Sequence, residues 1–222
     1  MKFYHIYIVK NKILKGIIKI MKKKYWAILL IIILIGIGGM IFYKKSLKLN
    51  KIGNNKSSQE VVDYILNLSS YETKITVTVT SNKNTNKYIL KQEFQSPNMS
   101  TQEVIEPSNI TGIKIINDGT TLKLENTNLN LNTILENYTY LGNNCLDLST
   151  FIEEYKKDDT ASYEERESEI IMKTKSSLDN IYIKEKILHI DKRTGMPKQM
   201  EIKDNKQKNT IYILYNEVRI NM

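Results

Sequence analysis

Lys74-Ile-Thr-Val-Thr-Val-Thr80 alternates polar and apolar residues along its whole length. In an extended chain Ile75, Val77 and Val79 point to one side, and the lysine and the three threonines point to the other. A period of two built on β-branched residues predicts an antiparallel strand that buries one face and leaves the other in water. The sequence on both sides of this strand therefore has to supply its partners and a cover for its apolar face.

Further short strands are predicted on both sides of a central helical region. The N-terminal group includes a hairpin at Asn117-Asp118-Gly119, because an Asp-Gly pair between apolar runs is a strong hairpin signal. In the C-terminal group, Pro197 suits the first position of a strand. The predicted strands are 74–80, 88–94, 99–105, 112–116, 121–125, 169–174, 181–190, 198–204 and 210–215, with a possible last strand at 217–220.

Helices are predicted before the first strand and in the middle of the domain. Ser57 and Glu60 have the spacing of a capping box, and Val61, Val62 and Ile65 follow at helical intervals. Helical spacing also appears at 131–141 and at 146–155, the second with Asp147 or Ser149 as its cap. The order of elements predicts an α+β domain, a curved antiparallel sheet or incomplete β-barrel with helices covering its concave face.

An uncharged run of nineteen residues, 25–43, precedes the domain. At about 1.5 Å per residue, a helix of this length just spans a hydrocarbon core of about 30 Å. The sequence thus divides into a basic cytoplasmic lead (1–24), a transmembrane anchor (25–43), a polar linker (44–56) and an extracytoplasmic domain (57–222). Met21 followed by three lysines also resembles the natural beginning of a signal sequence, which makes Met21 an alternative start of the chain. A cleavage site can be drawn at 36–38, but the apolar run continues beyond it, which favours retention.

The charge distribution follows the same division. Residues 1–59 contain thirteen lysines and no acidic residue, whereas residues 60–222 carry a net charge of −4. The larger group of lysines lies before the apolar run, which favours a single-pass protein of the cell membrane with its N-terminus inside. Because the folded part lacks a basic excess, the sequence argues against a nucleic acid partner.

Residue types that carry catalysis are scarce. The only histidines are His5 and His189, and Cys145 is the only cysteine, so no catalytic, metal-binding or cofactor-binding residue is assigned. We expect His189 to be a hydrogen-bonded structural residue and Cys145 a small packing residue. Four glutamates surround Arg166, and we interpret them as a solvated acidic loop or edge strand rather than a glycosidase site: Glu164, Glu165, Glu167 and Glu169.

A resemblance to a known family rests on two stretches. Tyr71-Glu-Thr-Lys-Ile-Thr-Val-Thr-Val79 follows a helix, and Leu188-His-Ile-Asp-Lys-Arg-Thr-Gly-Met-Pro197 leads through Asp204 into 211–215. These stretches resemble the lipoprotein-carrier (LolA/LolB-like) superfamily and, within it, clostridial GerS-like germination lipoproteins. The resemblance covers residues 57–222. It implies an incomplete antiparallel barrel, and a non-catalytic protein that partners a zinc amidase of spore-cortex peptidoglycan.

One position departs from that family. Met40 stands where the family carries its lipidated cysteine, so no lipidation site is assigned and the retained helix must anchor the protein. The family acts through a protein interface rather than a short motif, so partner-binding residues and the oligomeric state are not assigned. The alternative function is that of a LolA-like carrier of lipid or lipoprotein, or an envelope sensor.

Overall fold

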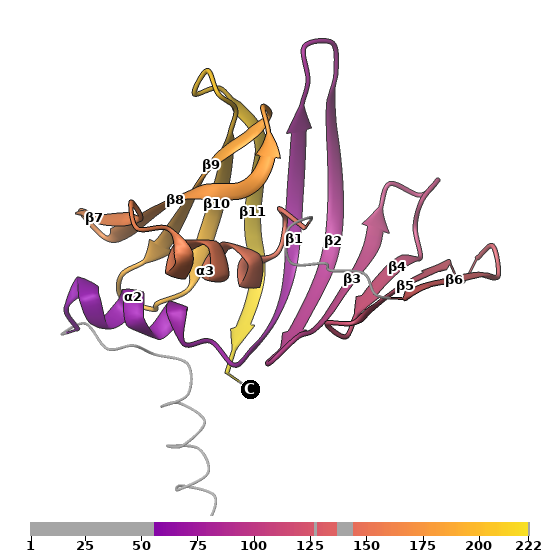
Figure 1. Ribbon diagram of the computed structural model, residues 1–222, viewed down its shortest axis with the longest axis horizontal. Helices are drawn as coiled ribbons and strands as arrows, with labels where there is room; N and C mark the ends of the chain where they lie inside the picture. Colours follow the sequence, from indigo (N-terminus) through magenta and orange to yellow (C-terminus); the bar gives the residue numbers. More distant parts are fainter. Residues whose placement is uncertain (1–55, 127, 137–143, 222) are drawn as a thin grey trace, which may run out of the picture. The chain divides into compact units, whose positions relative to one another are not determined.

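A computed structural model describes residues 56–126, 128–136 and 144–221 (Figure 1). The predicted lead 1–24, membrane span 25–43 and linker, apart from Lys56, lie outside these residues, as does Met40. Within the described ranges, no helix is both long and apolar enough to cross a membrane. The described residues belong to one compact unit.

The described strands form one eleven-stranded antiparallel sheet in the order β6-β5-β4-β3-β2-β1-β11-β10-β9-β8-β7. It consists of two meanders that join where β1 pairs with β11. The strands are β1 (Ser70–Thr80), β2 (Thr85–Gln95), β3 (Met99–Glu106), β4 (Ile113–Asn117), β5 (Thr121–Asn126), β6 (Leu131–Glu136), β7 (Ser162–Arg166), β8 (Glu169–Asn180), β9 (Ile183–Asp191), β10 (Pro197–Lys203) and β11 (Asn209–Ile220).

The alternating strand lies at the centre of this sheet, as its pattern predicts. Ile75 and Val77 are fully buried, while Thr76 between them is only half-buried on the other face. Pro197 begins β10, which confirms its predicted place at a strand start. Two short helices, α2 (Ser58–Leu66) and α3 (Leu148–Lys157), accompany the sheet. The predicted capping box is formed, since Ser57 and Glu60 each bond the other's backbone amide.

Both helices lie over the half of the sheet built from β8–β11 and the central strands (Figure 1). Phe151 of α3 and Ile65 of α2 are fully buried in one core with the inward residues of these strands. Strand residues of this core include Ile75, Met172, Leu188, Met200 and Ile213. All core residues of the described part lie between Val61 and Ile220, so we expect a fragment that starts at Lys56 to fold by itself.

Several predictions about elements need correction. The helix predicted at 131–141 is wrong, because residues 131–136 form strand β6, and 137–143 lie outside the described residues. The domain is therefore mostly β rather than α+β, with an open curved sheet. The strand predicted from Ile181 begins at Ile183, since Ile181 and Tyr182 form a turn. Residues predicted as two last strands form one, β11.

The second central helix is confirmed with a small shift. Asp147 occupies the N-cap position of α3, but its side chain makes no capping hydrogen bond. Its carboxylate instead accepts hydrogen bonds from the side-chain amides of Gln102 and Asn144, inside the core. Asp147 thereby links the start of α3 to β3, and α3 is held over the central strands.

Candidate functional site

Half of the helix-side face of the sheet has no described helix over it. Cross-strand pairing places the apolar residues of β4, β5 and β6 on the same face as the buried core, because directly paired residues share a face. Leu124 and Leu135 are 39% and 46% exposed there, whereas Met172 and Leu188 under α3 are fully buried. We call this surface the open apolar face: Ile113, Ile115, Leu122, Leu124 and Leu135.

The open apolar face continues to β6, an edge strand whose own residues include neither lysine nor proline. β6 ends the sheet, and Glu136 is its only charged residue. Ile134, on the opposite face from Leu135, is 57% exposed. An exposed apolar edge strand without lysine or proline can pair with an extended segment of another protein. This end of the domain therefore offers both an apolar face and a free edge for binding.

The other edge of the sheet is charged. In β7, Glu164 contacts Arg166 and Lys173, while Glu165 contacts Lys192 and Ser58. Hydrogen bonding to Lys173 lowers the pKa of Glu164, and hydrogen bonding to Lys192 lowers that of Glu165. Both groups therefore stay ionised at neutral pH.

Glu164 and Glu165 of the acidic cluster thus lie on an edge strand whose charges discourage pairing, one of the two interpretations made from the sequence, whereas Glu167 lies in the following turn and Glu169 begins β8. Tyr163 of the same strand donates a hydrogen bond to Gln59 of α2. This contact, with the one between Ser58 and Glu165, ties the start of α2 to the β7 edge. The two edges of the sheet therefore differ in chemistry, and the β6 edge is the one suited to a partner.

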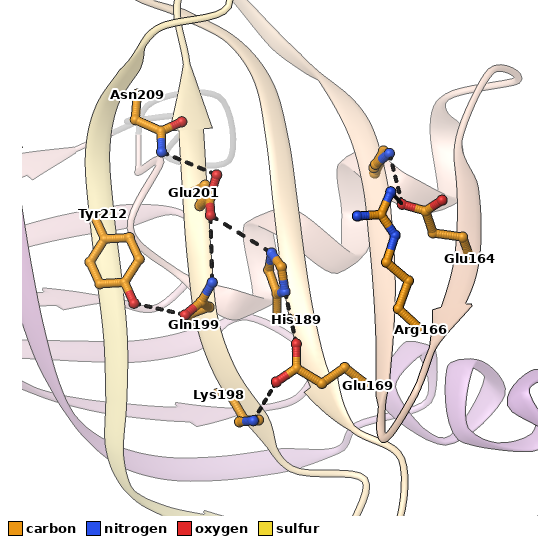
Figure 2. A network of polar contacts seen from close by, with 10 residues as sticks. Glu164, Arg166, Glu169, His189, Lys198, Gln199, Glu201, Asn209 and Tyr212 are labelled. Carbon is orange, nitrogen blue, oxygen red and sulfur yellow. Dashed lines mark hydrogen bonds and ion pairs between the residues drawn. The ribbon is translucent and has the colours of Figure 1, made fainter.

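A network of polar side chains lies on the face away from the helices, across β8 to β11 (Figure 2). His189 Nδ1 is 3.2 Å from Glu169 Oε2, and His189 Nε2 is 3.8 Å from Glu201 Oε1. Lys198 also pairs with Glu169, and this hydrogen bond is the main cause that lowers the pKa of Glu169. His189 is hydrogen-bonded, as predicted.

Strands β10 and β11 extend this network with further polar contacts. Tyr212 donates to Gln199 Oε1 over 2.7 Å, and Asn209 donates to Glu201 Oε2 over 3.1 Å. These are cross-strand contacts of the kind that stabilise a sheet surface. Within the described ranges, no group of three His, Cys, Asp or Glu side chains could hold a metal ion. The geometry supports a structural role for this network.

Cys145 lies in the loop that leads into α3 and is half-buried. Burial raises the pKa of its thiol above the usual value, which favours the protonated thiol over the thiolate at neutral pH. The sequence did not predict a second buried polar site close by, in which Lys186 of β9 pairs with Glu154 of α3 at 2.6 Å. This pair fixes α3 on the sheet.

Comparison with known proteins identifies the family of this chain. The model of the family described as "Sporulation protein YdcC-like" matches residues 22–222. The chain belongs to this family. The match includes the predicted anchor and the whole domain, and it makes this YdcC-like chain a sporulation protein. No curated protein matches the sequence.

Solved structures with a similar sheet share little sequence with this YdcC-like chain. The GerS lipoprotein of Clostridioides difficile, in complex with the CwlD amidase, is 22% identical with a TM-score of 0.48, over 74% of this chain and 96% of that one. An uncharacterized Thermus thermophilus protein is 11% identical with a TM-score of 0.49, over 75% and 88%. The LolA superfamily protein NE2245 of Nitrosomonas europaea is 9% identical with a TM-score of 0.41, over 75% and 94%.

Proposed function

We propose that this sporulation protein is a membrane-anchored, non-catalytic binding protein that holds a cell-wall amidase of the spore cortex at the membrane. The open apolar face is the observation that carries the proposal. Monomeric proteins rarely leave a continuous apolar surface in water unless it binds something. Here the neighbouring half of the same sheet shows what a covered surface looks like, with its core residues fully buried.

The position of this face suits a protein partner. Its aliphatic side chains come from three adjacent strands, so they form one surface rather than scattered positions. The free edge of β6 adds backbone hydrogen-bonding groups beside that surface. A partner can therefore pack on Leu124 and Leu135 and pair with β6 at the same time. Apolar contacts would supply affinity, and strand pairing would fix the register of the bound segment.

The amidase is proposed as partner from the resemblance of the C-terminal residues to GerS, which is seen in complex with the CwlD amidase. A non-catalytic role is supported by the described side chains themselves. His189 is held between two glutamates on a sheet surface, and burial raises the pKa of the Cys145 thiol, which disfavours the nucleophilic thiolate. The predicted helix at 25–43 would keep the complex at the membrane, with the domain outside the cytoplasm.

The interior of the domain does not favour the lipid-carrier alternative. Beneath α2 and α3, fully buried side chains such as Phe151, Ile65 and Leu188 fill the space between helices and sheet. An acyl chain of a bound lipid would have to displace these side chains, and protein interiors are too closely packed to admit one without rearrangement. Binding at the open apolar face needs no such rearrangement.

Co-purification tests the proposal. The full chain, extracted in detergent from sporulating cells, is expected to carry an exported amidase as its main partner, identified by mass spectrometry. Lipid extracted from the same sample is expected to match the detergent background. If no cell-wall amidase is enriched while a defined lipid is retained in proportion to the protein, the carrier function replaces the proposed one.

A further inference from the structure

Three hairpins end together at the side of the domain remote from α2 (Figure 1). Their tips are the β1–β2 turn (81–84), the β8–β9 turn (Ile181-Tyr182) and the β10–β11 turn (204–208). Residues of all three line one open pocket of about 550 Å³. We call this region the hairpin end. Strand β1 runs from the α2 side of the domain to the hairpin end. Its 11 residues, at roughly 3.3 Å each, separate α2 from the hairpin end by about 35 Å.

The β8–β9 turn breaks the usual rule for hairpin tips. Asn180 pairs with Ile183, so the turn contains only Ile181 and Tyr182, where Gly, Asn or Asp is usual. These two side chains are 54% and 60% exposed. The turn is nevertheless fixed in place, because Ile181 O accepts a hydrogen bond from the Asn205 amide over 3.0 Å. Tyr182 O accepts a second hydrogen bond from Thr210 Oγ1 over 2.7 Å.

The hairpin end is basic although the domain is acidic. Residues 60–222 carry a net charge of −4, whereas the three tips and the flanks of the β8–β9 turn carry four lysines and two aspartates. Lys184 pairs with Asp179, and Asp204 accepts backbone amides of its own turn. Within the described ranges, the ammonium groups of the other three lysines make no ion pair: Lys83, Lys206 and Lys208.

We propose that the hairpin end docks on an anionic lipid surface. Tyrosine and isoleucine side chains at an exposed tip insert at the boundary between headgroups and acyl chains, and lysines beside them attract anionic headgroups. A protein partner fits less well, because lysine is depleted in the buried cores of protein interfaces. In the pocket behind Tyr182, the side chains of Asn82, Asn84 and Lys208 can contact the phosphate and hydroxyls of a headgroup.

Cosedimentation of the fragment 56–222 with vesicles tests this proposal. We expect the fragment to sediment with vesicles of phosphatidylcholine mixed with phosphatidylglycerol, and to stay in solution with phosphatidylcholine alone. Raising the salt from about 0.1 M to about 1 M shortens the screening length from about 10 Å to about 3 Å and should release it. The double change Ile181→Ser with Tyr182→Ser should weaken binding about tenfold by removing the inserted apolar groups.

Lysine variants and a matched control locate the site. Lys83→Gln and Lys208→Gln should each weaken binding about fivefold, the contribution of one lysine near an anionic surface. Ile134→Ser removes an equally exposed isoleucine from β6 and should bind like the unmodified fragment. Equal sedimentation with neutral vesicles, no sedimentation at all, binding to purified peptidoglycan only, or an unchanged Ile181/Tyr182 variant would overturn the proposal. The amidase is proposed to bind the open apolar face and not the hairpin end. Failure of the vesicle experiment can therefore be distinguished from failure of the amidase experiment.

Discussion

Lys186 is an ionisable residue in the interior of the described domain. Its side chain is fully buried, and its ammonium lies 2.6 Å from the Glu154 carboxylate, with no other hydrogen-bond partner in the described part. The other oxygen of Glu154 accepts hydrogen bonds from Ser176 and Ser177. Period-two alternation places Lys186 on the same face as Leu188, so its inward position could be predicted. Its pairing with Glu154 could not be predicted, because Glu154 lies on a helix far away in the sequence.

Lys186→Met should therefore destabilise the fragment by about 3–5 kcal/mol, because it leaves the Glu154 carboxylate buried without a counter-charge. The double change Lys186→Met with Glu154→Leu should recover most of this loss. Urea unfolding followed by circular dichroism measures both free energies. A single variant as stable as the unmodified fragment would show that the pair is not buried as described.

Asp158, at the C-terminal end of α3, makes stability depend on pH. Its carboxylate accepts hydrogen bonds from the Lys175 amide and from the side chains of Thr160 and Thr174, and these lower its pKa well below the usual range. A lowered pKa in the folded state gives stability that is present above about pH 4 and is lost as the pH falls further.

The variant Asp158→Asn should lose stability at neutral pH and show a flatter decline below about pH 4 than the unmodified fragment. The neighbouring Asp159→Asn serves as the control and should keep the original slope. Thermal unfolding across this pH range gives the slopes. Parallel curves for the unmodified fragment and Asp158→Asn would contradict the role assigned to this carboxylate.

At the scale of elements, the correctly predicted segments are those whose local pattern agrees with their tertiary contacts. β1 alternates and is buried on one face, and α2 has both its capping box and its apolar stripe. β6 was mistaken for a helix because its leucines and isoleucine recur at intervals of three and four. As an edge strand it is exposed on both described faces, so no burial imposes a period of two, and pairing with β5 decides its structure.

The β4–β5 hairpin shows how tightly a predicted turn can be specified. Gly119 has φ = +92°, and an added Cβ would come within 2.7 Å of Asn98 Cβ. Gly119→Ala should cost about 1–3 kcal/mol of unfolding free energy, from the unfavourable φ and the steric overlap. Thr120→Ala in the same turn should cost less. Urea denaturation compares them, and a neutral Gly119→Ala would mean that the turn adopts another conformation.

At the scale of the whole molecule, the domain is asymmetric along its sheet. One half is covered by α2 and α3 and ends in the charged strand β7, and the other half is uncovered by any described helix and ends in β6. The sequence predicted a large sheet and its two groups of strands, because most of the strands, β6 and β7 excepted, have a local signature. It could not predict which half stays open, since this depends on where α3 docks through residues far apart in the chain.

A matched pair of leucines tests the central claim, that the open apolar face binds the partner. Leu124 on this face and Leu214 on the opposite face are 39% and 40% exposed, so an aspartate at either position should disturb the fold equally little. The measurement is the dissociation constant of the full chain for the co-purified amidase. We predict that Leu124→Asp weakens binding about tenfold or more, as loss of an interface anchor does, and that Leu214→Asp leaves it unchanged. Equal constants for the two variants would contradict the account.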